Sequence, residues 1–209
     1  GMIGVLLILL IGLVGPMLIA KPDGYTQDIL QAPSALHWLG TDNIGLDIFA
    51  ELVWGARTSL YVSVMAMLIA GVIGIPVGLL CGYNTGWLRE VIDGFIDIFM
   101  TLPMLPLMII IAAVMGTSFT NVAIIFKHIL INATGPVFVN MTLVMASAVL
   151  TEASLSFLGL GDPTTWSWGT MLKRAWGQNA VISSPNPWWW WLLPSLCIVV
   201  YVVCFNLLG

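Results

Sequence analysis

Long apolar stretches separated by short polar ones form the dominant pattern of this chain. Five stretches carry no Asp, Glu, Lys or Arg, and each is long enough to cross a bilayer, which takes about 20 apolar residues in a helix. They are residues 1–20, 58–88, 98–126, 128–151 and 175–209. The alternating segments of about 10 residues that build a transmembrane β-barrel are absent from the sequence. The pattern predicts an all-α fold, a polytopic bundle of transmembrane helices.

Within these stretches we expect five membrane spans, at residues 2–20, 58–82, 99–115, 133–151 and 188–208. The first span lacks the basic residues that open a cleaved signal peptide, so a retained anchor is expected, with cleavage as the alternative. The last span begins with four consecutive tryptophans, which are typical of an anchor at the membrane interface.

Polar segments join the spans. Residues 21–57 and 162–187 are predicted as loops. Within the first loop, Asp47 is expected to cap a short helix over residues 47–54. Residues 86–99 combine charged positions at helical spacing with an apolar face, which predicts an amphipathic helix with a solvated charged face.

Small residues recur at every fourth position of the second span, and this spacing places them on one face of a helix. Small side chains let helix backbones approach closely in lipid, so we expect a tight helix–helix seam. The seam consists of Ala66, Ala70, Gly74, Gly78 and Gly82. Chance, in a segment rich in glycine and alanine, is the alternative.

The sequence after the third span is too short for the span that should follow it. A new apolar run begins at Val122, but Lys127 follows it at once. Five helical residues cover only about 7.5 Å of a hydrocarbon core about 30 Å thick. A lysine inside one interrupted span would cost several kcal/mol unless paired. We therefore expect that sequence is missing near residues 124–127.

Composition narrows the classes of function. Charged residues make up 8% of the 209 residues, against about 25% in soluble domains, so lipid must solvate much of the surface. The net charge of −4 comes with no basic cluster, which argues against nucleic-acid binding. The sequence contains no P-loop, nucleotide fingerprint, zinc-binding helix or nucleophile elbow, so we predict no cofactor, metal or catalytic residue in this chain. An enzyme would need Glu152 to share one cavity with Asp93 and Asp97.

Four runs carry a family pattern: His37 to Asp42 with Gly45 to Asp47; Trp54 to Leu60; Phe126 to Asn132; and Thr151 to Gly161, followed by Trp166 to Met171 and Phe205 to Gly209. In this order they resemble the second, C-type permease subunit of the peptide/nickel class of ABC importers. The resemblance implies the type I importer permease fold, with six spans where five are visible. It implies an N-terminal anchor and extracytoplasmic segment over residues 1–57 and a permease transmembrane domain over residues 58–209.

The same resemblance implies partners and a mechanism. Such a subunit pairs with a second, homologous permease in the cytoplasmic (inner) membrane, as a multi-pass protein. Two cytoplasmic ATPase subunits bind ATP, an extracytoplasmic solute-binding protein delivers substrate, and transport proceeds by alternating access. Signature or pathway positions are implied at Gly40, Thr41, Asp42, Gly55, Arg57, Glu152, Gly159 and Gly161. The two glycines of the last run are expected to form the turn that ends the membrane segment.

The chain departs from the family pattern in several places. Leu46 stands where the family usually has Arg, and Ile131 where it usually has Pro. The cytoplasmic coupling loop, which carries an EAA…G motif and docks on the ATPase, is absent where residues 122–127 look broken. Counted literally, five spans would invert everything after this gap. Peptide is the expected substrate; nickel or another small solute is one alternative, and a degenerate, non-transporting structural subunit is another.

Overall fold

The computed structural model describes residues 1–22, 26–83, 86–101, 137–162 and 164–208. These residues form six helices and no strand, which agrees with the predicted all-α class. The helices are α1 (Met2–Leu18), α2 (Ile48–Tyr83), α3 (Trp87–Thr101), α6 (Val137–Phe157), α7 (Trp168–Gly177) and α8 (Trp188–Asn206).

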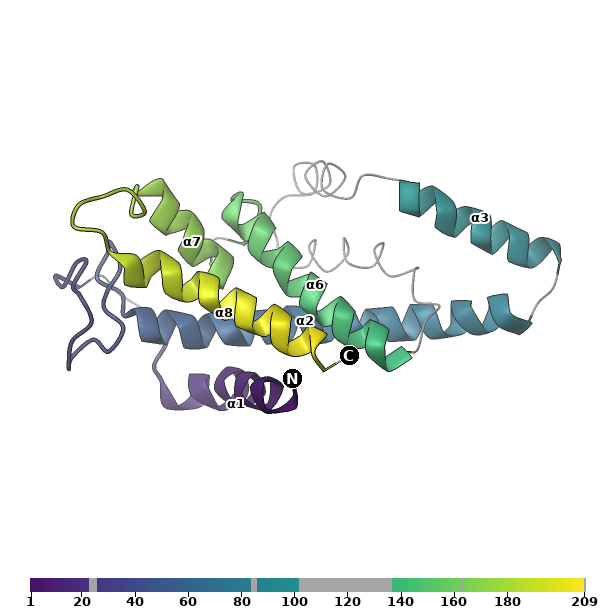
Figure 1. Ribbon diagram of the computed structural model, residues 1–209, viewed down its shortest axis with the longest axis horizontal. Helices are drawn as coiled ribbons and strands as arrows, with labels where there is room; N and C mark the ends of the chain where they lie inside the picture. Colours follow the sequence, from purple (N-terminus) through teal and green to yellow (C-terminus); the bar gives the residue numbers. More distant parts are fainter. Residues whose placement is uncertain (23–25, 84–85, 102–136, 163, 209) are drawn as a thin grey trace.

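Helix α2 is the spine of the structure (Figure 1). It packs along α6 and α1, and α8 lies against both of these helices. Helices α2 and α6 run antiparallel, because Ala66 clusters with Ala148 while a Cβ at Gly71 would meet Met141. The main core lies between α2, α6, α7 and α8, where Trp190 and Tyr201 are at most 1% exposed.

The two polar segments lie at one end of the bundle (Figure 1). The indole nitrogen of Trp189, at the start of α8, donates to the carbonyl of Thr41 at 3.2 Å. Helix α2 ends, and α6 begins, at the other end. Both polar segments therefore lie on one side of the bundle, whereas a literal count of five spans would place them on opposite sides.

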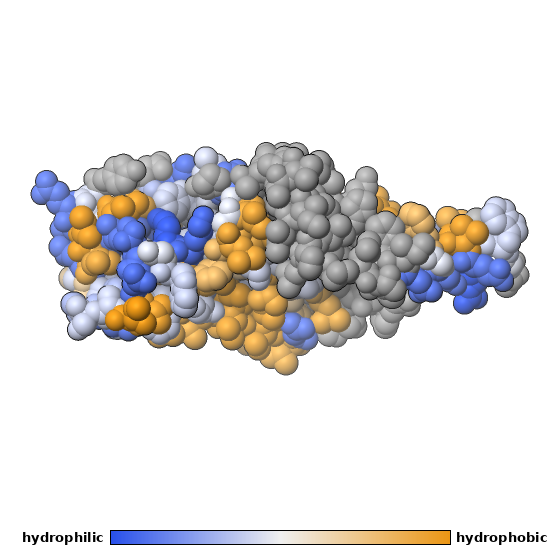
Figure 2. Space-filling model, turned by 90° about the horizontal axis from the view of Figure 1, so that it is seen from above, coloured by the Kyte–Doolittle hydropathy of each residue, from blue (hydrophilic) through white to orange (hydrophobic). Residues whose placement is uncertain are grey.

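Apolar residues gather in the middle of the face shown in Figure 2, next to the polar loop end. Residues Ile48–Gly78 and Trp188–Asn206 are helical, long and apolar enough to cross a membrane, and Met2–Leu18 and Met141–Phe157 are shorter apolar helices. Their outward side chains include Met17, which is 85% exposed. Such exposed apolar surface suits contact with lipid.

Several predicted boundaries change. Residues 47–54 do not form a separate helix; they join the first turns of α2, whose amides at Phe49 and Ala50 are capped by Asp47 at 2.9 and 3.2 Å. No proline follows the cap until Pro76, and the helix continues past it to Tyr83. Helix α6 runs to Phe157, beyond the expected end at residue 151, and within it the Thr151 and Ser154 hydroxyls donate to the carbonyls of Ser147 and Leu150.

A helix also interrupts the predicted loop over residues 162–187. Ser167 and Thr170 form a capping box that starts α7. The tryptophan anchor is only partly at a surface, since Trp189 and Trp190 are buried in protein and Trp188 is 47% exposed. The third span over residues 99–115 and the gap near residues 124–127 lie largely or wholly outside the described residues.

Candidate functional site

A buried ion cluster joins three segments at the loop end of the bundle. The Arg174 guanidinium on α7 donates to Asp42 Oδ2 at 3.1 Å and to Glu51 Oε1 on α2. Both carboxylate side chains have 0% exposure, and that of Arg174 has 27%. The guanidinium also lies over the ring of Trp166, 5.1 Å from its centroid. The cluster thus fixes α7 against the start of α2.

Asp42 has a second function in the loop. Its Oδ1 accepts hydrogen bonds from the amides of Ile44 and Leu46 at 2.9 and 2.8 Å, which closes a local turn. Leu46, the departure from the family's Arg, is 5% exposed and its side chain belongs to the packed interior. One carboxylate therefore shapes the loop and binds Arg174.

Gly40 and Thr41 complete this signature. Gly40 has a φ of +80°, and a Cβ there would lie 2.6 Å from the carbonyl oxygen of Gln31. The Thr41 hydroxyl accepts from the Gln31 amide at 2.8 Å and donates to the Asp28 carbonyl. Both residues have a positioning role in the loop. Gly40 adopts the left-handed turn, and Thr41 links its own part of the loop to the earlier part.

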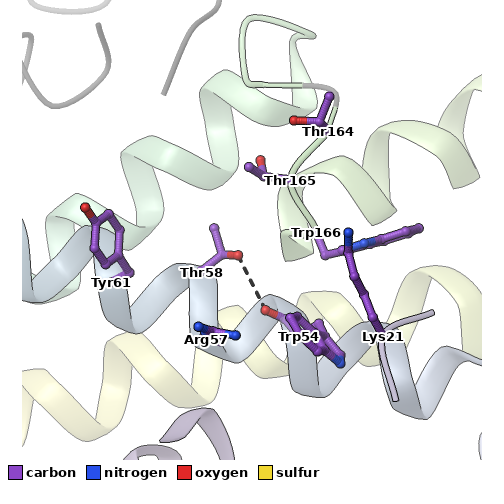
Figure 3. Close-up of a pocket in the computed structure, with 8 residues that line it drawn as sticks. All are labelled: Lys21, Trp54, Arg57, Thr58, Tyr61, Thr164, Thr165 and Trp166. Atoms are coloured by element: carbon purple, nitrogen blue, oxygen red, sulfur yellow. Dashed lines mark hydrogen bonds between the residues drawn. The ribbon is translucent and has the colours of Figure 1, made fainter. Parts of the chain in front are cut away.

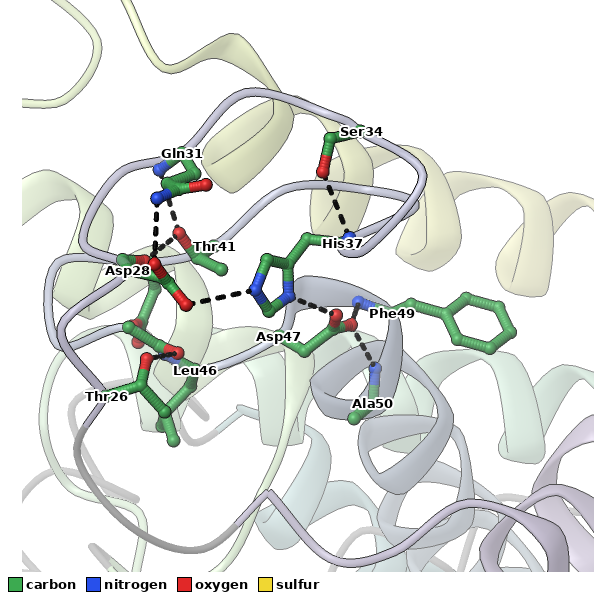
Figure 4. A network of polar contacts seen from close by, with 12 residues as sticks. Thr26, Asp28, Gln31, Ser34, His37, Thr41, Leu46, Asp47, Phe49 and Ala50 are labelled. Atoms are coloured by element: carbon green, nitrogen blue, oxygen red, sulfur yellow. Dashed lines mark hydrogen bonds and ion pairs between the residues drawn. The ribbon is translucent and has the colours of Figure 1, made fainter.

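His37 ties the same loop to the start of α2 (Figure 4). Its Nδ1 lies 2.9 Å from Asp47 Oδ2, and its Nε2 lies 3.7 Å from Asp28 Oδ2. Asp47 meanwhile caps α2 through its other oxygen. No three His, Cys, Asp or Glu side chains of the described residues are grouped in a way that could hold a metal ion.

Glu152 lies on α6, 6% exposed, and accepts a hydrogen bond from the Ser156 hydroxyl at 2.7 Å. Helix α7 packs closely here, because a Cβ at Gly169 would meet the Ala153 carbonyl oxygen at 2.4 Å. Asp93 and Asp97 are exposed on α3, which extends from the opposite end of α2 (Figure 1). These three carboxylates do not share a cavity.

Gly159 ends α6 in a Schellman turn. It has a φ of +86°, its amide bonds the Ser156 carbonyl at 3.1 Å, and the Leu160 amide bonds the Leu155 carbonyl at 2.8 Å. A Cβ at Gly161 would lie 2.3 Å from the Ser156 hydroxyl, so the chain passes close to the Glu152 partner.

A cavity of about 330 Å³ opens beside the ion cluster, between the end of α1, α2 and the segment before α7 (Figure 3). It is lined by two cations, three aromatic side chains and three threonines: Lys21, Arg57, Trp54, Tyr61, Trp166, Thr58, Thr164 and Thr165. Trp54 donates to the Ile19 carbonyl at 3.3 Å, and the Arg57 guanidinium lies 5.3 Å from the Trp54 ring centroid. The two cations give this cavity a positive charge that suits an anionic group.

The remaining predicted positions lie along α2. A Cβ at Gly55 would approach the Trp168 ring at 2.6 Å, and the Trp168 indole donates to the Leu52 carbonyl at 3.1 Å. Of the expected seam, Ala66 and Ala70 are buried, and Ala66 clusters with α6. Gly74 is buried as well.

Farther along the seam, no described atom lies within 4 Å of a Cβ placed at Gly78. Gly82 lies in the last turn of α2. The described α2–α6 contact therefore covers the first part of the stripe.

Sequence reasoning missed Arg174, Glu51 and Trp166. The available signal was the Ser–Thr capping box before Arg174, which marks a helix in the supposed loop.

Comparison with known proteins assigns this architecture. The family described as "Binding-protein-dependent transport system inner membrane component" matches residues 74–126. The dipeptide transport system permease protein DppC of Alkalihalophilus pseudofirmus is 33% identical, over 100% of this chain and 81% of its own length. The chain belongs to this family of ABC importer permeases. The glutathione transport system permease protein GsiD of Pectobacterium atrosepticum is 31% identical, over 86% of this chain and 71% of its own length.

The alignments also bear on the expected gap in this permease. The family match ends at residue 126, next to Lys127. The alignment with DppC runs over 254 positions, 45 more than the 209 residues of the permease. The relative therefore has at least 45 positions in total, within the aligned part, that have no counterpart in this permease.

Proposed function

We propose that this permease is the C-type subunit of an ATP-driven importer of peptides. The observation that carries the proposal is its similarity over the whole chain to a dipeptide permease, together with the oligopeptide transport system permease protein OppC of Bacillus subtilis at 33% identity over 82% of the chain. A solute-binding protein delivers the peptide, and the permease pair moves it across the inner membrane by alternating access.

The arrangement of the described residues supports this function. The loop end, held by Arg174 and His37, presents a rigid polar face to the side that receives substrate. The long apolar helices support a place in the inner membrane, where we propose a multi-pass arrangement. A second permease and two ATPases complete the transporter, with ATP bound on the ATPase subunits. Within the six-span fold that we propose, residues 1–57 form the anchor and outer segment and residues 58–209 the transport domain.

Whether ATP hydrolysis can drive transport through this subunit depends on the expected coupling loop, on which an ATPase would dock. An ATPase needs a cytoplasmic loop on which to dock, and the 45 unmatched positions of the relative are long enough to contain one. A chain that truly lacks this segment is a structural subunit, so the two forms give opposite predictions for ATPase binding.

Uptake measurements test the proposal. The permease is expressed with its partner subunits in cells without other peptide permeases. Two forms are compared: the unaltered permease, and a variant with the corresponding DppC segment inserted after Phe126. The inserted form is expected to bind the ATPases and to take up labelled dipeptide in a manner that needs ATP and the solute-binding protein. Uptake of Ni²⁺ but not dipeptide would replace peptide by nickel as substrate. Failure of both forms to bind an ATPase would refute the importer function.

A further inference from the structure

A second cavity, of about 580 Å³, adjoins the cationic one and has the opposite chemistry. It lies between α1 and α2 and is lined by apolar residues of both helices, among them Leu13, Met17 and Val64. Arg57 and Tyr61 line both cavities, so the two meet at these side chains. Each volume lies in the range of about 300–1,000 Å³ found for small-molecule sites.

The cationic end lies where the apolar helix α1 finishes. The Trp54 indole donates to the carbonyl of Ile19, the residue that follows α1, and Lys21 comes two residues later. Arg57 lies about one turn farther into α2 than Trp54. Tryptophan, arginine and lysine at this depth are typical of the membrane interface. The apolar groove therefore extends from the interface into the depth of the bilayer.

The described residues that line the two cavities include the cations Lys21 and Arg57. Among the described residues that line either cavity there is no Asp or Glu. The nearby buried carboxylates, Asp42 and Glu51, are paired with Arg174. No carboxylate of the described residues forms an ion pair with Arg57, which lines both cavities and is drawn among the residues of the smaller one in Figure 3.

The groove is open to the bilayer at its side. Leu13 and Met17, which form its α1 wall, are 63% and 85% exposed. A ligand can enter laterally from lipid, whereas a water-soluble peptide would have to place its polar backbone in an apolar groove, which is unfavourable.

We propose that the joined cavities bind one anionic phospholipid. Its phosphate lies at Arg57 and Lys21 between the aromatic walls, and an acyl chain lies in the groove between α1 and α2. The bound lipid would fasten α1 to α2 beside the ion cluster. This site depends on insertion in a membrane and not on peptide transport, so either proposal can fail alone.

Lipid titration of the purified permease, followed by native mass spectrometry, tests the headgroup. Phosphatidylglycerol is expected to bind more tightly than phosphatidylcholine with the same acyl chains. One cation near an anionic headgroup contributes about a five-fold gain in binding. Arg57→Gln should therefore weaken the binding of phosphatidylglycerol about five-fold and have little effect on the binding of phosphatidylcholine. Arg57→Lys should retain the preference. Arg89→Gln, which removes an exposed cation on α3, is the matched control and should change nothing.

Two further experiments test whether the acyl chain lies in the groove and whether a free phosphate ester can replace the lipid. Leu13→Trp, a substitution at an exposed position that narrows the groove, should weaken both lipids. Glycerol 3-phosphate should not displace bound lipid. An unchanged preference in Arg57→Gln, unchanged binding in Leu13→Trp, or displacement by glycerol 3-phosphate would each overturn the proposal. It would also be overturned if the permease alone bound the lipid but the assembled transporter did not, because a partner subunit would then fill the groove.

Discussion

Replacing Arg174 by methionine tests the argument that buried charge holds the loop end together. Its guanidinium pairs with Asp42 and Glu51, both of which have 0% side-chain exposure. Removing the cation leaves two buried carboxylates uncompensated, and breaking a buried pair in this way costs about 3–5 kcal/mol. Asp42 keeps two backbone N–H donors, so most of the loss should come from Glu51. In a chain of this size the expected fall in Tm is on the order of 10 °C.

Thermal unfolding of the purified permease in mild detergent, followed by tryptophan fluorescence, measures the change. Arg89→Met is the control, because Arg89 and Asp93 are 55% and 51% exposed and such surface pairs contribute about 0–1 kcal/mol. Adding Glu51→Met to Arg174→Met should restore most of the stability, since apolar replacement of a buried ion pair is often neutral. If Arg174→Met unfolded at the temperature of the control, or if the double variant were no more stable than the single one, the reasoning would be refuted.

Three further substitutions are measured in the same unfolding assay. Gly169→Val should lower the free energy of unfolding by about 1–3 kcal/mol, because the larger side chain forces α7 away from α6. Gly177→Ala, with open space around its Cβ, should be neutral or slightly stabilising. Equal changes in stability for the two variants would contradict the close approach of α7 to α6. Ser156→Ala should cost about 1–3 kcal/mol by removing a hydrogen bond to buried Glu152, and no loss would show that the bond is dispensable. Trp189→Phe should cost about 1–3 kcal/mol because it leaves the buried Thr41 carbonyl without its indole donor, and a gain in stability would contradict this.

The apolar pattern predicted the helices near both ends of the chain. The expected spans at residues 2–20 and 188–208 correspond to α1 and α8, and the amphipathic segment at residues 86–99 corresponds to α3. Long charge-free runs have few alternatives to a helix in lipid, because every backbone polar group must be paired within the segment. The pattern failed for α7, because a ten-residue helix with charged and polar positions resembles a loop unless its capping box is recognised.

Residue types and their order determined the class of this protein: an all-α membrane chain, and the ABC importer permeases as its family. The placement of Arg174 was decided only by the tertiary structure. Its carboxylate partners lie 132 and 123 positions away along the chain, and no local periodicity relates them. The same holds for the lipid site, whose cationic and apolar halves join only because α1 packs beside α2. Local patterns specify helices, whereas contacts between distant segments depend on how those helices pack.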